Sequence, residues 1–276
     1  MELLMIIKAI ILGLVEGLTE FAPVSSTGHM IIVDDMWLQS EKFLTQHGAN
    51  TFKIVIQLGS ILAVVVTFKD RFIDLLGLSR FKTKAKSEQG SLRLSQVIVG
   101  LIPAGVLGVL FNDYIDEHLF STATVLIGLV IGAVLMILAD LFGPKIPKVQ
   151  TVDQITYKQA LTVGLFQCFS LWPGFSRSGS TISGGVLMGM SHRAAADFTF
   201  IMAVPIMAGA SFLSLLKNWE YMTLDALPIF IAGFISAFIF ALLSIRFFLK
   251  LINKIKLLPF AIYRIVLALL LYIIFF

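Results

Sequence analysis

The chain has 276 residues, of which 58% are hydrophobic and 14% are charged, and its mean hydropathy is +0.93. Soluble domains carry about one charged residue in four, so this composition excludes an ordinary soluble domain and indicates a polytopic membrane protein. The formal net charge of +4 comes from basic residues in a few connecting segments, which indicates membrane orientation rather than nucleic-acid binding.

The first apolar region contains more polarity than a passive membrane span. Its residues 13–30 read GLVEGLTEFAPVSSTGHM. Glu16 and Glu20 are four residues apart and share one face of a helix, which Pro23 then ends. The run SSTGH at 25–29 is typical of the capped start of a second, short helix. We therefore expect a helix, a break, and a half-helix whose N-terminus faces the two glutamates.

Six apolar segments are long enough to cross a bilayer about 30 Å thick as helices of ~20 residues. They cover approximately residues 49–68, 95–112, 121–142, 193–216, 226–248 and 258–275. Two further apolar regions, 3–35 and 158–190, are interrupted by Pro or Gly and by a polar cluster. Unpaired backbone at membrane depth is tolerated only inside protein or along a cavity, so we interpret both regions as re-entrant helix-loop-helix elements. The predicted fold class is all-α, with a single membrane domain over residues 1–276.

The second interrupted region repeats the first. A shift of 151 residues aligns GLFQ at 164–167 with GLVE at 13–16, and SRSG at 176–179 with SSTG at 25–28. We predict an internal duplication, with repeat 1 at residues 1–145 and repeat 2 at 146–276. Each repeat would hold one re-entrant element and three crossings, and an odd number of crossings inverts the second copy. The alternative is chance similarity between membrane helices rich in small residues, against which the matched polar residues argue.

Charged residues predict the orientation of the chain. The loops expected in the cytoplasm carry Lys69, Arg71, Arg80, Lys82, Lys84, Lys86 and Arg93, then Lys145, Lys148 and Lys158, then Arg246, Lys250, Lys254 and Lys256. The alternate connections carry Asp113, Asp116, Glu117 and His118, or Glu220 and Asp225 with the single Lys217. Because cytoplasmic loops are enriched in Lys and Arg, these alternate connections and both termini are predicted to face outward. The two re-entrant tips should then meet near mid-membrane.

An anion site is predicted in the second re-entrant element. Its WPGFSRSGST, residues 172–181, places Arg177 among hydroxyls and glycines at the start of a half-helix. Free backbone N–H groups, the helix dipole and a guanidinium fork all favour phosphate oxygens. An arginine at bilayer depth needs a partner, and phosphate, Glu16 or Glu20 could serve. The alternative is a buried Arg–Glu pair that only joins the two repeats.

The first re-entrant element offers a nucleophile, a base and a metal site. Ser26 and His29 are three residues apart, so the imidazole could activate the hydroxyl or protonate a leaving group. The alternative is a helix cap followed by an interfacial histidine. Glu16 and Glu20 could hold a divalent cation, Mg²⁺ or Ca²⁺, or one could act as a base; glutamates reaching to the interface are the alternative. Gln57, Asp140 and Asp197 are also polar residues in or beside spans, and their spacing assigns them no role.

The two motifs together carry a resemblance to a known family. EGLTEFAPVSSTGH at 16–29, PGFSRSGST at 173–181, QLGSILAVV from Gln57 and LPFAIYR ending at Arg264 resemble the undecaprenyl-pyrophosphate phosphatase family, membrane phosphatases linked to bacitracin resistance. The likeness covers essentially the whole chain. It implies dephosphorylation of undecaprenyl pyrophosphate to undecaprenyl phosphate in the bacterial inner membrane, which recycles the lipid carrier of peptidoglycan synthesis.

The resemblance and the residue types together give one predicted site. Its catalytic residues are Glu20, Ser26, His29 and Arg177; its phosphate-binding residues are Ser25, Thr27, Ser176, Arg177, Ser178 and Thr181; its metal ligands are Glu16 and Glu20. Whether Ser26 or a water attacks phosphorus stays open. The expected partners are the lipid substrate and the membrane, with no nucleic acid, and a homodimer is compatible with the sequence. The active site is predicted to face the periplasm or the outside.

A second reading comes from another class of protein. Inverted repeats with broken helices at the midplane are how many secondary transporters are built, so a transporter or flippase of an anionic lipid is the alternative function. A phosphatase would release inorganic phosphate without a membrane gradient. A transporter would need sealed vesicles and would leave its substrate intact.

Overall fold

The computed structural model describes residues 2–78, 91–119, 121–218 and 224–276, and within these ranges helices carry the fold. The elements are α1 (Glu2–Thr19), α2 (Ser26–Met30), the π-helix η1 (Ile31–Leu38), α3 (Glu41–Thr67), α4 (Lys69–Leu75), α5 (Leu94–Leu110), α6 (Asn112–His118), α7 (Thr122–Phe142), η2 (Val152–Gln154), α8 (Tyr157–Gln167), η3 (Cys168–Leu171), α9 (Arg177–Leu187), α10 (His192–Asn218), η5 (Leu224–Ala226), α11 (Leu227–Ile255) and α12 (Leu258–Phe275). The all-α prediction is confirmed. The basic residues at 80, 82, 84 and 86 and the acidic residue at 220, which entered the orientation argument, lie outside the described residues.

Five of the six predicted crossings correspond to long apolar helices, and the sixth corresponds to a shorter one. In the described ranges α3, α7, α10, α11 and α12 are long and apolar enough to cross a membrane. The sixth, α5, is a shorter apolar helix of 17 residues, which at 1.5 Å per residue spans about 26 Å. The helix expected to start near residue 49 begins earlier, at Glu41, because its first turn continues across a kink at Thr45, where φ is 64°. The chain is therefore a polytopic membrane protein.

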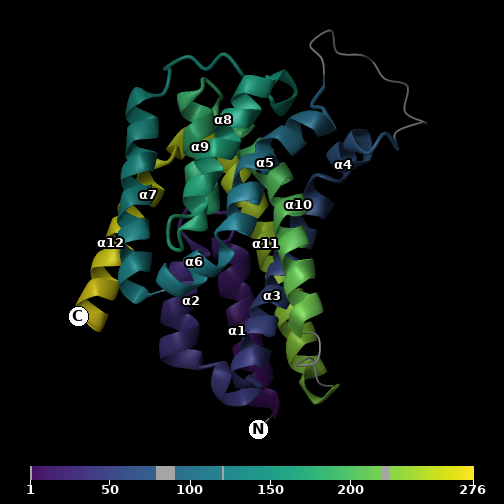
Figure 1. The fold of residues 1–276 in the computed structure, drawn as a ribbon, viewed down its shortest axis with the longest axis vertical. Helices are drawn as coiled ribbons and strands as arrows, with labels where there is room; N and C mark the ends of the chain where they lie inside the picture. The colour runs from purple at the N-terminus through teal and green to yellow at the C-terminus, as the bar shows by residue number, and fades with distance from the viewer. Residues whose placement is uncertain (1, 79–90, 120, 219–223) are drawn as a thin grey trace.

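The two interrupted regions form helix-break-helix elements at opposite ends of the molecule. Figure 1 shows α1 and α2 in the lower half and α8 and α9 in the upper half, with both chain termini in the lower half. The elements touch where their breaks meet: Ser178 Oγ donates a hydrogen bond to the carbonyl oxygen of Ala22 at 3.2 Å. The predicted meeting of the two tips is therefore present in the fold.

Each re-entrant helix packs on a long helix from the other half of the chain. Helix α1 lies against α11, and α8 lies against α5. Both contacts use glycines, since a Cβ at Gly13 would overlap the carbonyl oxygen of Gly233 and a Cβ at Gly164 would overlap that of Gly100. Gly13 and Gly164 are the residues that the 151-residue shift pairs. This reciprocal packing supports the predicted duplication, whose boundary between residues 145 and 146 stays a prediction.

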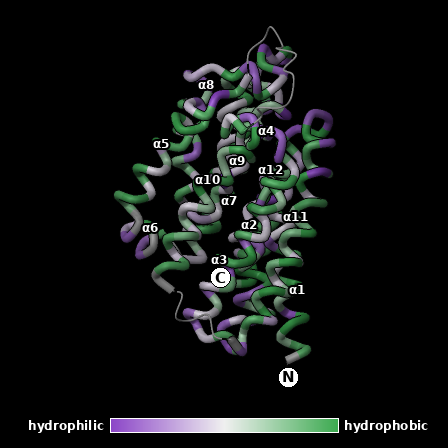
Figure 2. Tube along the Cα trace, turned by 90° about the vertical axis from the view of Figure 1, so that its right-hand side faces the viewer, coloured by the Kyte–Doolittle hydropathy of each residue, from purple (hydrophilic) through white to green (hydrophobic). Residues whose placement is uncertain are grey.

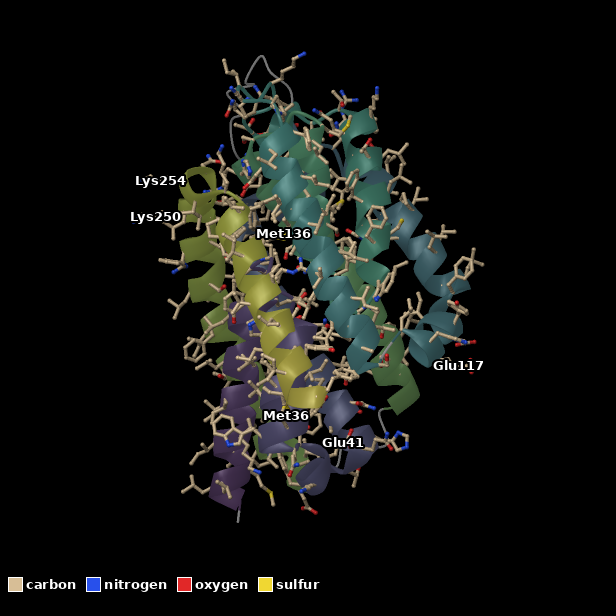
Figure 3. The ribbon with its side chains drawn as sticks, turned by 90° about the vertical axis from the view of Figure 1, so that its left-hand side faces the viewer. Met36, Glu41, Glu117, Met136, Lys250 and Lys254 are labelled. Carbon is tan, nitrogen blue, oxygen red and sulfur yellow. The ribbon has the colours of Figure 1, made fainter. Side chains whose placement is uncertain are left out.

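Hydropathy and charge follow the long axis of the molecule. Hydrophobic residues colour most of the length of the long helices in Figure 2. Lys250 and Lys254 lie toward the upper end, and Glu41 and Glu117 lie toward the lower end (Figure 3). A core of fully buried side chains, including Phe21, Phe198 and Phe200, lies between the ends. This distribution agrees with the charge argument, in which the basic end is cytoplasmic.

Candidate active site

The first re-entrant element brings two glutamates to the break after α1. The Glu20 N–H still donates to the carbonyl oxygen of Glu16, at 2.9 Å, so the helical turn reaches Glu20 before Pro23 ends it. Glu16 is 6% exposed, and the side chain of Glu20 is 9% exposed. Two ionised carboxylates one turn apart repel each other, and a positive charge nearby would relieve that repulsion.

Helix α2 begins with a serine in a conformation that L-residues rarely adopt. Ser25 has a φ of 70°, and its Oγ caps the helix by accepting a hydrogen bond from the Gly28 N–H at 3.4 Å. The next residue, Ser26, donates from its Oγ to Glu20 Oε2 at 2.7 Å. A short bond from a hydroxyl to a carboxylate places the carboxylate where it can take the hydroxyl proton.

Helix α9 begins in the same way. Ser176 has a φ of 71°, and its Oγ accepts from the Gly179 N–H at 3.2 Å. Ser176 and Gly179 are the residues that the 151-residue shift pairs with Ser25 and Gly28, so the matched sequence positions also have matched geometry. A strained backbone at a helix start persists only where the surrounding structure holds it.

Arg177, the first residue of α9, reaches across to the first element. Its Nη2 lies 2.9 Å from Glu20 Oε1, and the guanidinium carbon lies 5.8 Å from the centre of the Phe21 ring. Its Nη1 is buried and has no hydrogen-bond partner among the described residues. Arg177 therefore neutralises Glu20 and keeps one buried N–H group free for a ligand.

These groups line a cavity of about 280 Å³ between the two tips. The polar part of its lining is Glu20, Ser25, Ser26, Thr27, Gln57, Gln167, Ser170, Ser176 and Arg177. The remaining lining is Ala104, Leu171, Trp172, Pro173, Gly174, Ile206, Met207 and Ala210. A cavity with converging polar groups and an apolar wall suits an amphiphile with an anionic head.

The loop before α9 is fixed from behind by a second buried arginine. Arg264 of α12 is fully buried and donates from Nη2 to the carbonyl oxygens of Gly174 at 2.9 Å and Gly128 at 3.2 Å. Trp172 Nε1 donates to the carbonyl oxygen of Thr124 at 2.9 Å. These bonds attach the loop to α7 and α12, so Arg177 projects from a rigid support. Sequence reasoning assigned Arg264 no role.

His29 is not brought to Ser26. Its Nδ1 lies 2.8 Å from the carbonyl oxygen of Ser25, and its Nε2 lies 2.7 Å from Tyr263 Oη. Both ring nitrogens are therefore engaged, and His29 does not line the cavity. Glu20, rather than His29, is the partner of the Ser26 hydroxyl.

Four of the six predicted phosphate-binding residues line the cavity, and two do not. Ser178 is 1% exposed and donates to the Ala22 carbonyl oxygen; Thr181 is fully buried and donates to the Arg177 carbonyl oxygen at 2.8 Å. Ser178 thus joins the two re-entrant elements, and Thr181, which accepts from Thr199 Oγ1 at 2.9 Å, joins α9 to α10. The four that line it are Ser25, Thr27, Ser176 and Arg177; Glu20 and Ser26, from the predicted catalytic set, line it as well.

The predicted metal ligands offer one free buried oxygen. Glu16 Oε1 is buried without a hydrogen-bond partner, although Glu16 lies behind Glu20 and does not line the cavity itself. Carboxylate oxygens are the ligands that Mg²⁺ and Ca²⁺ prefer, so the residue types suit a hard divalent cation, but both Glu20 oxygens are already paired with Ser26 and Arg177. The described residues contain no group of three or more His, Cys, Asp or Glu that could hold a metal. Such an ion would complete its shell with phosphate oxygens and water.

Two glutamines on the cavity wall were not recognised as site residues. Gln57 was noted as a polar residue in a span, and its Oε1 accepts from Ser211 Oγ at 3.4 Å. Gln167 appeared only as the repeat partner of Glu16. The repeat alignment could have identified Gln167 as a site residue, because it pairs Gln167 of the second element with Glu16 of the first.

Comparisons with known proteins match the chain to a family model and to named relatives. Residues 9–270 match the family model described as "Bacitracin resistance protein BacA". The chain is 79% identical over 276 residues to an undecaprenyl-diphosphatase of Geobacillus sp. (strain WCH70), with 100% of each chain covered. It is 72% identical to an undecaprenyl-diphosphatase of Anoxybacillus flavithermus, again over 100% of each chain. It is 64% identical over 263 residues, or 95% of each chain, to an undecaprenyl-diphosphatase of Bacillus subtilis (strain 168).

Proposed function

Because the chain belongs to the bacitracin resistance protein BacA family, we infer that it is an undecaprenyl-diphosphatase of the bacterial inner (plasma) membrane. It hydrolyses undecaprenyl pyrophosphate to undecaprenyl phosphate and inorganic phosphate, and so recycles the lipid carrier of peptidoglycan synthesis. The alternative of a lipid transporter is not favoured, since relatives 64–79% identical to the chain are named as diphosphatases.

One observation carries the proposed chemistry: a single carboxylate, Glu20, joins the Ser26 hydroxyl and the Arg177 guanidinium on the cavity wall. The free Nη1 of Arg177 would donate to the terminal phosphate of the substrate. Arginine is suited to this because its planar fork can hold a carboxylate and a phosphate oxygen at once. The N-terminus of α9 adds the positive end of a helix dipole at the same place.

We propose Ser26 as the nucleophile and Glu20 as the general base. Ser26 Oγ forms a bond to the terminal phosphorus while Glu20 takes its proton, and the bond from that phosphorus to the bridging oxygen breaks. Undecaprenyl phosphate leaves with the bonding electrons. A water then attacks the phosphoserine, which releases inorganic phosphate and restores the hydroxyl. A water in place of Ser26 would give the same products, but no phosphoserine would form.

The test of this function is phosphate release by the purified protein. In detergent, with no membrane gradient, one inorganic phosphate and one undecaprenyl phosphate should form per substrate consumed. Acid quenching during turnover of substrate labelled in the terminal phosphate should trap label on Ser26. If the substrate instead stays intact and moves only across sealed vesicles, the protein is a transporter.

The apolar wall of the cavity supports a sideways exit for the lipid tail. Ala104 comes from α5, and Ile206, Met207 and Ala210 come from α10. A tail of this length cannot be left in water, since each buried CH₂ is worth about 0.8 kcal/mol. We propose that the diphosphate occupies the polar wall while the tail leaves between α5 and α10 into the lipid.

We propose that Glu16 and Glu20 also hold a divalent cation, Mg²⁺ or Ca²⁺. When bound, the cation would neutralise charge on the phosphate oxygens. The unpartnered Glu16 Oε1 supports this assignment, since a buried carboxylate oxygen without a partner is costly.

Glu16→Gln is expected to raise the metal concentration that gives half-maximal activity by about tenfold, because one carboxylate ligand is replaced by a weaker neutral oxygen. The measurement is activity against free Mg²⁺ and Ca²⁺ after treatment with a chelator. Glu41→Gln, an exposed glutamate at the lower end, is the control and should keep the wild-type midpoint. An unchanged midpoint in Glu16→Gln would remove Glu16 from the metal site.

We propose that the active site opens to the outer face. Along α10, the residues at 200–203 are buried in the core, whereas the cavity is lined by residues at 206, 207 and 210, nearer the end of the helix that lies low in Figure 1. The upper end, which carries Lys250 and Lys254, is thus closed off from the cavity by packed side chains. The positive-inside rule assigns that closed end to the cytoplasm.

A cysteine at Thr27 in a Cys168→Ser background tests this orientation, because Thr27 lines the cavity. In intact spheroplasts, a membrane-impermeant thiol reagent should label Thr27→Cys, and substrate should reduce the labelling. Lys145→Cys, exposed at the opposite end, should be labelled only after the cells are opened. The reverse pattern would place the site on the cytoplasmic face.

A further inference from the structure

Gln167 is a cavity-lining residue whose entire side-chain amide is buried and unpaired among the described residues. It is the last residue of α8, it is 1% exposed, and it lines the cavity. Neither its Nε2 nor its Oε1 has a hydrogen-bond partner among the described residues. The amide is thus buried, unpaired and next to the space that the substrate would occupy.

A second glutamine on the same helix shows what a structural amide looks like here. Gln159 is 9% exposed; its Oε1 accepts from the Thr156 N–H at 3.0 Å, and its Nε2 donates to the Met188 carbonyl oxygen at 3.1 Å. Buried amides in folded proteins are paired in this manner, because an unpaired polar group loses its hydration without replacement. Gln167 departs from that rule, which indicates that its partner is not part of the protein.

The position of Gln167 indicates which part of the substrate it would contact. Helix α8 packs on α5 through Gly164 and Gly100, and one turn further along each helix Gln167 and Ala104 both line the cavity. Ala104 belongs to the apolar wall proposed for the lipid tail, whereas Arg177 and Ser26 mark the place of the terminal phosphate. The phosphate that stays on the lipid must lie between these two regions.

We propose that Gln167 is a further substrate-binding residue, whose Nε2–H donates to an oxygen of the lipid-linked phosphate, the leaving group. This rests on the proposed phosphatase function. That phosphate gains negative charge as the bridging bond breaks, so a donor placed there strengthens its interaction in the transition state. The repeat counterpart, Glu16, is a carboxylate; at position 167 a carboxylate would repel the diphosphate, whereas an amide supplies a donor without added negative charge.

The test compares Gln167→Leu with Gln159→Leu. In Gln167→Leu, kcat/KM for undecaprenyl pyrophosphate should fall about 10- to 100-fold, the effect of losing a hydrogen bond to a charged group. Its melting temperature should be unchanged or higher, because an unpaired buried amide has been removed. Gln159→Leu should show the opposite: a lower melting temperature, because the Thr156 and Met188 groups lose their partner, and a kcat/KM close to that of the wild type.

Inhibition by inorganic phosphate separates the two phosphate positions. The inhibition constant should change less than about twofold in Gln167→Leu, since free phosphate binds where the terminal phosphate is attacked. Gln167→Glu keeps the shape of the side chain and should lose at least as much activity as Gln167→Leu. It allows the proposal to be tested even if the leucine variant does not fold. A wild-type kcat/KM in both variants, or a fall that is matched by lost stability, would overturn the proposal while leaving phosphatase activity of the wild type intact. An equal weakening of phosphate inhibition would overturn the assignment to the leaving group.

Discussion

Arg177→Lys is expected to lower kcat/KM for undecaprenyl pyrophosphate by about 100- to 1,000-fold, the usual effect of removing one preorganised donor from a transition state. In the structure Nη2 is held by Glu20 and Nη1 is free, so the two ends of one planar group serve the protein and the substrate. Lysine keeps the charge but is a single point donor. It cannot bind the Glu20 carboxylate and the substrate phosphate at once in the same geometry.

The measurement is steady-state hydrolysis with folding checked by thermal denaturation in detergent. Arg193→Lys is the matched control, because Arg193 also pairs with a carboxylate, Asp197 at 2.9 Å, but lies outside the cavity lining. Its kcat/KM should stay within about threefold of the wild type. Turnover near the wild-type rate in Arg177→Lys would remove Arg177 from the phosphate site.

Glu20→Gln is expected to lower kcat by about 10³-fold, within the range for loss of a general base. The amide cannot take the Ser26 proton, and it also leaves the buried guanidinium of Arg177 without a counter-charge. One carboxylate performs both tasks, so the effects should not be additive. In the double variant Glu20→Gln with Arg177→Lys, kcat should fall by much less than the product of the two single fold-losses.

A pre-steady-state experiment identifies the step that Glu20 affects. At saturating Mg²⁺, substrate should bind with similar affinity in Glu20→Gln, while the first phosphate-transfer step slows. Asp34→Asn is the control; Asp34 is 1% exposed but pairs with Lys53 at 2.9 Å, away from the cavity, so its loss should reduce stability without this kinetic effect. A Glu20→Gln protein within about tenfold of the wild-type rate would exclude Glu20 as the base.

The sequence was enough to predict the parts of the fold that depend on local chemistry. Pro23 and the serine runs predicted where the helices break and restart. The 151-residue register paired Ser25 with Ser176, and the structure shows that both cap the helix that follows. The cost of leaving a charge unpaired in lipid predicted a partner for Arg177 and left phosphate, Glu16 and Glu20 open; in the structure the partner is Glu20.

The rest depended on packing, which no local pattern encodes. The separation of Ser26 and His29 by three residues suggested a hydrogen bond, but Tyr263, from the last helix of the chain, lies against one ring nitrogen and the carbonyl oxygen of Ser25 against the other. Thr181 has the residue type of a phosphate ligand, yet it is buried behind the first turn of α9. Neighbours more than 200 residues away in the chain, such as Tyr263 for His29, cannot be read from spacing alone.

The reciprocal packing of the two halves also sets an order of assembly during translation. Ser236 Oγ of α11 donates to the Ile10 carbonyl oxygen of α1 across 226 residues of chain, and Arg177 meets Glu20 across 157 residues. At about 5 to 20 residues per second, the ribosome needs roughly 10 to 45 seconds to supply α11 after α1 has been made. During that interval α1 lacks the surface of α11, and for about the first 8 to 31 seconds, until Arg177 has been made, Glu20 also lacks its counter-ion. The nascent N-terminal helix therefore waits in a partly assembled state, and the catalytic pair is completed only when the second half of the polypeptide has been inserted.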